Sequence, residues 1–178
     1  MKKLLFLLIA VLVFSPGCLV IYKINYTIEM KTEKKGTATV RFYDIRSDAI
    51  GNREFEEDKK NLFEYLYRGG EIIESLKSEG KYLMKRTLDV NDNKLNGVAV
   101  YDFDDINKVE GIRYESGLYY LTLQTEDSVL TTNGSIEYNP LYKRIIWSGD
   151  AKKLQFEILA DKPERNTREL VSHFRKLK

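Results

Sequence analysis

The sequence predicts an α+β fold: a mostly antiparallel, curved β-sheet with two short helices after its first hairpin and a helix at the C-terminus. Three observations predict this class. Apolar and polar residues alternate along residues 20–43, and apolar residues recur at helical spacing within 52–78. Strand-like segments separated by short turns then follow one another as far as residue 160.

The first hairpin is predicted from a sequence period of two, which is typical of strands with one buried face. Its first strand has apolar residues at Val20, Tyr22, Ile24, Tyr26, Ile28 and Met30, with polar residues between them. A turn at residues 33–36 follows, and residues 37–43 return as the second strand. On that strand Ala38, Val40 and Phe42 share one face.

Two helices are predicted over residues 52–68 and 71–78. Helical spacing in the first joins Phe55, Lys59, Leu62, Phe63, Leu66 and Tyr67. Gly69 and Gly70 follow it and are expected to end it. The second helix is expected to turn Ile72, Ile73 and Leu76 inward.

Most of the remaining chain is predicted as strands. They cover residues 81–90, 98–103, 118–125, 128–138, 142–148 and 153–160. Turn residues occupy 91–97, and one turn of helix with an aspartate cap is expected within 104–109. The closing helix is predicted to begin near Asp161. Its core-facing residues are Leu170, Val171, Phe174 and Leu177.

The first 17 residues have the order of a secretory signal peptide. Lys2 and Lys3 precede the apolar residues 4–14, and small or helix-breaking residues follow at 15–17. This apolar run is too short to span a bilayer as a helix, which needs about 20 residues. Gly17 and Cys18 resemble the cleavage site of bacterial lipoproteins. That resemblance implies cleavage between them, a diacylglyceryl thioether on Cys18 and attachment to the membrane.

Other interpretations of this segment remain open. Ser15 stands where the lipoprotein motif normally has Leu, Val or Ile, and an ordinary signal peptidase would also accept Ser15 and Gly17. Residues 4–22 could also form an uncleaved anchor with a kink at Pro16. A buried free thiol is the plainest alternative for Cys18. Lipidation explains best why a single cysteine stands directly after a signal peptide.

Cleavage would leave one globular domain of ordinary size, residues 18–178, after the signal peptide 1–17. The whole chain has 29 basic and 27 acidic residues, and the segment 1–17 holds two lysines and no acid. The mature chain is therefore neutral, with 27 of each, and we predict no nucleic-acid partner. Its 12 Tyr and 8 Phe indicate a folded chain.

Side chains that carry chemistry are few. His173 is the single histidine, so a catalytic triad or a transition-metal site is not expected. Residues 89–94 begin like a calcium loop, but Lys94 replaces its glycine and Val100 its bidentate Glu. We predict no catalytic residue, metal or cofactor. The alternative is an envelope enzyme that uses the carboxylates between Asp89 and Asp105.

The aromatic residues suggest a different kind of site, because a curved sheet under helices can enclose an apolar cavity lined by tyrosines. A cavity of several hundred Å³, on the order of the volumes of known ligand sites, would favour an apolar ligand. A filled core would favour a protein partner instead. The sequence does not identify individual ligand-binding residues.

The stretch GVAVYDFDDINKVEG, residues 97–111, resembles the LppM-like lipoprotein domain of bacteria. In that family a hairpin and a helical segment follow the cysteine, and a Gly-Val-x-Val strand then ends in a Phe-Asp motif. A later strand often carries Trp, as RIIW does at 144–147. An amphipathic basic helix stands here where a transmembrane helix is common in the family. The resemblance implies an envelope lipoprotein, with lipid or glycolipid binding in some members, and supplies no catalytic residue.

We therefore expect a non-catalytic, membrane-tethered envelope lipoprotein that binds an apolar ligand or an envelope partner protein. A structural or assembly role is a further alternative. Leu19 follows the cysteine, so the Asp-type signal that retains lipoproteins in the inner membrane is missing. If the source has two membranes, the expected location is the periplasmic side of the outer membrane.

Overall fold

The computed structural model describes residues 19–160 and 166–177. The predicted signal peptide, its cleavage after Gly17 and the lipidation of Cys18 lie outside the described residues. These three statements therefore stay predictions. The proposed start of the last helix near Asp161 lies outside them as well.

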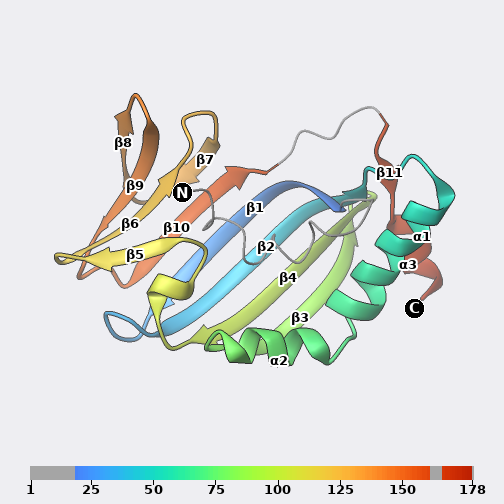
Figure 1. Cartoon of the computed structure of the whole chain (residues 1–178), viewed down its shortest axis with the longest axis horizontal. Coiled ribbons are helices and arrows are strands. Elements are labelled where there is room, and N and C mark those ends of the chain that lie inside the picture. The colour runs from blue at the N-terminus through green and yellow to red at the C-terminus, as the bar shows by residue number, and fades with distance from the viewer. Residues whose placement is uncertain (1–18, 161–165, 178) are drawn as a thin grey trace.

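Two antiparallel sheets form most of the domain (Figure 1). The first has the order β3-β4-β2-β1-β10-β7, and β11 pairs with β2. Its strands are β1 (Leu19–Met30), β2 (Gly36–Ser47), β3 (Lys81–Asn91), β4 (Lys94–Phe103), β7 (Ser128–Thr132), β10 (Lys153–Leu159) and β11 (Arg168–Glu169). The second has the order β5-β6-β9-β8. Its strands are β5 (Ile112–Glu115), β6 (Leu118–Leu123), β8 (Ser135–Asn139) and β9 (Tyr142–Ser148). The predicted α+β class, with mostly antiparallel strands, is confirmed.

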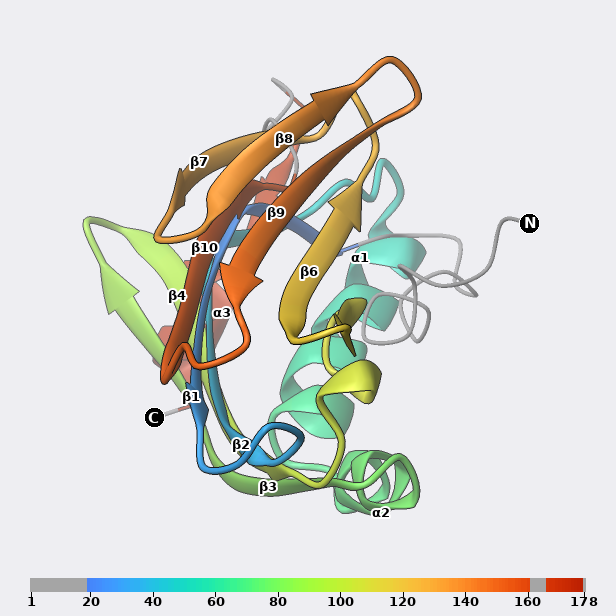
Figure 2. The ribbon, with the colours of Figure 1, turned by 90° about the vertical axis from the view of Figure 1, so that its left-hand side faces the viewer.

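Within the described residues, five short helical segments accompany the two sheets. They are α1 (Asn52–Lys60), the π-helical η1 (Asn61–Leu66), α2 (Glu71–Ser78), the 3₁₀ turn η2 (Ile106–Lys108) and α3 (Val171–Lys176). Figure 1 shows α1 and α3 at one end of the domain and the second sheet at the other. Figure 2 shows β1 to β4 bending toward the side on which α1 and α2 lie. No helix within the described residues has the length and apolar character needed to cross a membrane.

Two apolar clusters hold these layers together. The larger one lies between the two sheets and includes Tyr26, Trp147 and Phe156, whose exposed fractions are all 5% or less. The rings of Tyr26 and Phe156 stack with their centroids 4.5 Å apart. The smaller cluster joins the far end of the first sheet to η1 and α3, through residues such as Ile45, Phe63 and Phe174.

At one point along the paired strands β1 and β2, the alternation of inward and outward residues is interrupted in both strands. The sequence pattern did not predict this interruption. Asp44 adopts a left-handed conformation (φ 56°), and its backbone N–H donates to Asn96 Oδ1 over 3.1 Å. The paired residues Ile24 and Phe42 face inward on one side of this kink, and the paired residues Ile21 and Ile45 face inward on the other side. The prediction that Val20 and Tyr22 share the buried face of Ile24 is therefore wrong.

Other element boundaries also differ from the prediction. The turn between β3 and β4 is only Asp92 and Asn93, both with positive φ, as in a two-residue hairpin of type I′. Residues 94–97 therefore belong to β4. The segment 128–138 divides into β7 and β8, which lie in different sheets, and β5 was not predicted. The last helix begins at Val171, after the strand β11.

Candidate functional site

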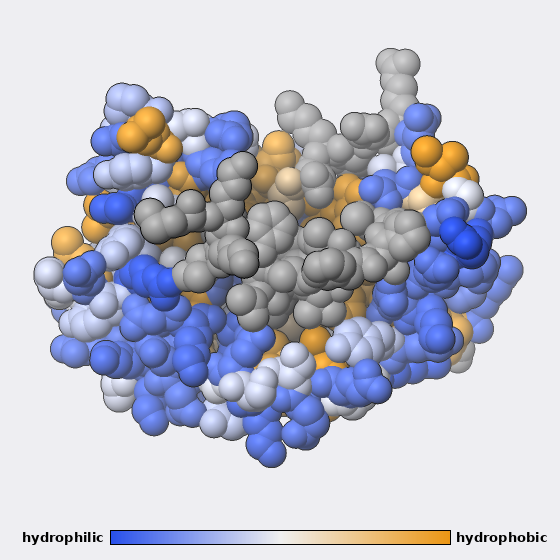
Figure 3. All heavy atoms as spheres, viewed as in Figure 1, coloured by the Kyte–Doolittle hydropathy of each residue, from blue (hydrophilic) through white to orange (hydrophobic). Residues whose placement is uncertain are grey.

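An open apolar cavity lies between one face of the first sheet and the helices η1 and α2. β1 to β4 form its floor, and η1 and α2 form its roof. The apolar residues that line it are Leu19, Ile21, Ile24, Val40, Phe42, Ile45, Leu62, Leu66, Ile72, Leu76, Leu83, Leu88, Val98 and Ala99. Tyr26, Tyr67 and Tyr101 also line it. Figure 3 shows hydrophobic residues in the middle of this side, between two mainly hydrophilic flanks.

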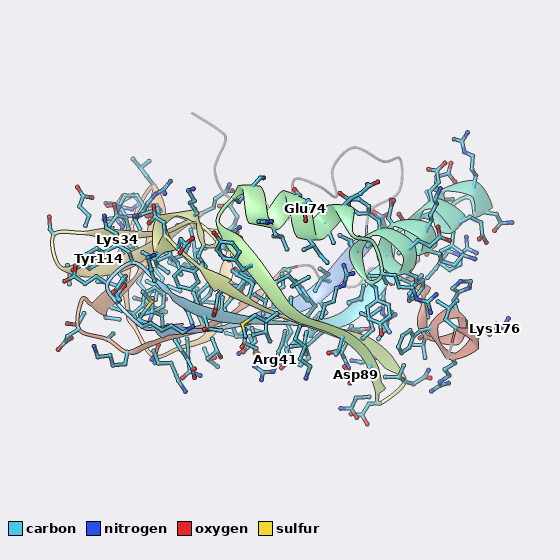
Figure 4. All side chains as sticks on the ribbon, turned by 90° about the horizontal axis from the view of Figure 1, so that it is seen from below. Lys34, Arg41, Glu74, Asp89, Tyr114 and Lys176 are labelled. Atoms are coloured by element: carbon cyan, nitrogen blue, oxygen red, sulfur yellow. The ribbon has the colours of Figure 1, made fainter. Side chains whose placement is uncertain are left out.

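The small side chain of Ala99 on β4 explains why the sheet itself does not fill the cavity. Ala99 pairs with Val40 on β2 and with Arg86 on β3, and Gly97 occupies the next inward position. Ala99 is only partly buried although its strand lies inside the sheet. In Figure 4 α2, which carries Glu74, lies on one side of the sheet, and Arg41 and Asp89 lie on the opposite side. The cavity therefore belongs to one face only.

The size of the cavity limits what it can hold. Its volume is about 170 Å³. An apolar protein cavity of about 150 Å³ takes up one benzene molecule, whereas sites for drug-sized ligands measure about 300–1,000 Å³. The cavity is thus smaller than the several hundred Å³ expected for an ordinary ligand site. It suits a segment of one apolar chain rather than the two chains of a bilayer lipid.

A polar cluster closes the cavity where β3 begins. Lys81 is buried, with 2% of its side chain exposed, and its Nζ lies 3.2 Å from Glu79 Oε2. Nζ also lies 5.9 Å from the centroid of the Tyr101 ring. The Tyr101 hydroxyl donates to Glu110 Oε1 over 3.1 Å, and Glu110 hydrogen-bonds Tyr26 as well. One cation and two carboxyl groups therefore meet at this end.

Burial controls the ionisation of this cluster. Desolvation raises the pKa of Glu110, and the nearby charge of Lys81 and the Tyr101 hydroxyl oppose this only in part. Desolvation also raises the pKa of Tyr26 and of Tyr101, and the neighbouring Glu110 adds to both shifts. The two phenols therefore stay protonated and act as hydrogen-bond donors to Glu110.

The Glu110→Gln variant is expected to be more stable than the natural protein at neutral pH. The folded-state pKa of Glu110 lies above its ordinary value of 4.5. The stability that protonated Glu110 contributes is therefore fully present when the pH is below 4.5. It is lost as the pH rises through the folded-state pKa, and Gln avoids this loss. Urea unfolding of both proteins between about pH 4 and about pH 8 measures the difference. A difference that does not change with pH would contradict the raised pKa.

Arg86 is the cation that lines the cavity, and Glu79 is the anion. Arg86 Nη1 donates to the carbonyl oxygens of Leu66 and Gly69, over 3.0 and 2.9 Å. Leu66 is the last residue of the π-helical segment η1 and Gly69 follows it, so both carbonyls lie at the negative end of a helix dipole, which favours a cation. No ion pair within the described residues includes Arg86.

The carboxylates of the enzyme hypothesis do not meet in the cavity. Asp102 accepts from Thr37 over 2.5 Å and binds Lys31 at 3.0 Å, and both contacts lower its pKa. Asp104 accepts from Tyr82 and binds Lys35 at 3.2 Å, which likewise lowers its pKa.

The remaining candidates of the sequence analysis also have local roles. Asp105 caps η2, as expected, by accepting from the Asn107 backbone N–H. The His173 ring lies 5.4 Å from the Phe63 ring, and desolvation lowers the pKa of His173. Among the described residues no three His, Cys, Asp or Glu side chains could hold a metal ion together.

The sequence pattern did not point to Arg86 as a cavity residue, nor to Lys81 and Glu110 as the polar cluster beside the cavity. An irregularity between Leu83 and Lys85 shifts the register of β3. Lys81 and Leu83 face inward before it, and Arg86 and Leu88 face inward after it, so no single period of two connects them. The cavity could have been found only from the partial exposure of apolar residues that a filled core would bury. That exposure is visible in the structure and not in the sequence.

Comparison with known proteins adds no relative: no family model, no curated protein and no solved structure matches this chain. The resemblance to the LppM-like domain therefore stays a prediction.

Proposed function

We propose that this chain is a non-catalytic lipoprotein of the bacterial cell envelope that binds one apolar chain in its cavity. The cavity is the observation that supports this proposal, because partly exposed apolar residues line it on several elements. The curvature of the first sheet and the two helices after the first hairpin leave this space open. Asp102 and Asp104, each held by its own lysine, support a non-catalytic role.

The proposed anchor is a lipid on Cys18. Cys18 directly precedes Leu19, where β1 begins and which itself lines the cavity. A lipid at that position would hold the domain close to the bilayer, with no linker between them. An apolar molecule leaving the bilayer would then have a short path to the cavity. The outer membrane, facing the periplasm, is the proposed location if the source has two membranes.

The Cys18→Ser variant is expected to lose its attachment to membranes, because a serine hydroxyl cannot form the thioether. Fractionation of cells that produce each protein measures this loss. An intact-mass spectrum of the natural protein should give the mass of residues 18–178 plus acyl groups. A spectrum that includes residues 1–17, or an unmodified Cys18, would contradict the anchor and favour an uncleaved or secreted form.

Ligand binding is tested separately with palmitic acid that carries a photoreactive diazirine on its chain. The membrane-extracted protein is placed in phosphatidylcholine nanodiscs with this probe and irradiated. Peptide mass spectrometry should locate crosslinks in β3, β4 and α2, which line the cavity. Crosslinks spread over the convex face, with none in these elements, would contradict a cavity site and favour an envelope partner protein.

A further inference from the structure

We infer that the ligand carries an anionic head group, a carboxylate or a phosphate, and that Arg86 binds it. This inference rests on the proposed function and identifies the chemical class of its ligand. The apolar chain would cross the floor of the cavity from Arg86 on β3 toward Leu19 and Ile21 on β1.

The hydrogen bonds of Arg86 leave one edge of its guanidinium group free. Nη1 makes both bonds to the carbonyl oxygens of Leu66 and Gly69. Nε and Nη2 have no partner within the described residues. No buried side-chain nitrogen or oxygen there lacks a hydrogen bond, so both atoms are accessible, and Arg86 lines the cavity. Nε and Nη2 lie on one edge of the planar group, which fits two oxygens of a carboxylate or phosphate.

The fixed position of Nη1 favours binding at this edge. Two carbonyl oxygens hold the guanidinium in place before a ligand arrives. Less side-chain freedom is therefore lost when an anion binds. In an apolar cavity such charge-assisted hydrogen bonds are also stronger than in water.

The other cation near the cavity does not offer the same site. Lys81 is paired with Glu79 at 3.2 Å, and Glu110 lies beside it, so two carboxyl groups face one ammonium. Lys81 and Arg86 pair with Phe103 and Ala99, so they lie roughly 13 Å apart along the sheet at about 3.3 Å per residue of β4. An anion is therefore disfavoured near Lys81 and favoured near Arg86.

The test compares three diazirine probes in phosphatidylcholine nanodiscs at a pH of about 9, at which a carboxylate in a membrane is ionised. The probes are palmitic acid, its uncharged methyl ester and lysophosphatidic acid. We expect at least one anionic probe to crosslink to the cavity about tenfold to hundredfold more than the ester. Preference for the acid would identify a carboxylate ligand, and preference for the lysolipid would identify a phosphate.

Arg86→Gln should remove this preference, and Arg86→Lys should keep part of it, because Lys retains the charge without the planar fork. If Arg86 only held the loop after η1, its loss would lower crosslinking of all three probes equally, and the inference would be wrong. Equal crosslinking of all three probes in the natural protein would overturn it too, while leaving the cavity function intact. Absence of cavity crosslinks with every probe would overturn the proposed function itself.

Discussion

Ala99→Phe is expected to lower crosslinking of photoreactive palmitate to the cavity by about tenfold or more. The side chain of Ala99 lies on the cavity floor, between Val40 and Arg86 in the register of the sheet. A phenyl ring there would occupy a large part of the 170 Å³ volume. The variant needs no rearrangement of the core, because it extends into empty space.

Val100→Phe is the matched control for this experiment. Val100 is the next residue of β4, is also partly buried, and does not line the cavity. The Val100→Phe variant should crosslink photoreactive palmitate to the same extent as the natural protein. Urea unfolding of both variants would show that each is folded, and Ala99→Leu should give an intermediate loss. Unchanged crosslinking in folded Ala99→Phe would contradict a ligand site above β4.

The double variant Glu79→Gln/Glu110→Gln is expected to lose about 3–5 kcal/mol of folding free energy. Both carboxyl groups that lie beside the buried Lys81 would then be neutral. An ammonium that is only 2% exposed cannot regain the solvation it loses on folding. The single variant Glu79→Gln should cost less, because Glu110 can ionise and take over the pairing.

A double-mutant cycle measured by urea unfolding tests this coupling. The loss in the double variant should exceed the sum of the two single changes. Adding Lys81→Met to the double variant should recover most of the stability, because the unpaired cation is removed and the aliphatic stem is kept. Strictly additive single changes would show that Glu110 does not compensate for Glu79.

Local sequence patterns determined much of the fold. The period of two in β1 from Ile24 to Met30, the position of α2 and the aspartate cap of η2 depend on neighbouring residues, so the sequence alone predicts them. The prediction that Ile73 of α2 faces inward is wrong, because Ile73 is 38% exposed. The stripe of Leu170, Val171, Phe174 and Leu177 was predicted as a core face; the first three are buried, and Leu177 is partly buried against them. The N-terminal signal pattern with Cys18 is likewise local, and it carries the proposal of a membrane anchor.

Only the tertiary structure decided the site. The kink at Asp44 depends on Asn96, which lies 52 residues further along the chain, so no local pattern shows which face of β1 is inward before Ile24. The β3 irregularity similarly places Lys81 and Arg86 on one face. Whether the sheet and its helices fill the space between them depends on the volumes of residues brought together from six elements. The small side chain of Ala99 leaves that space open, and Arg86 becomes a site because the carbonyls of Leu66 and Gly69 hold one side of it.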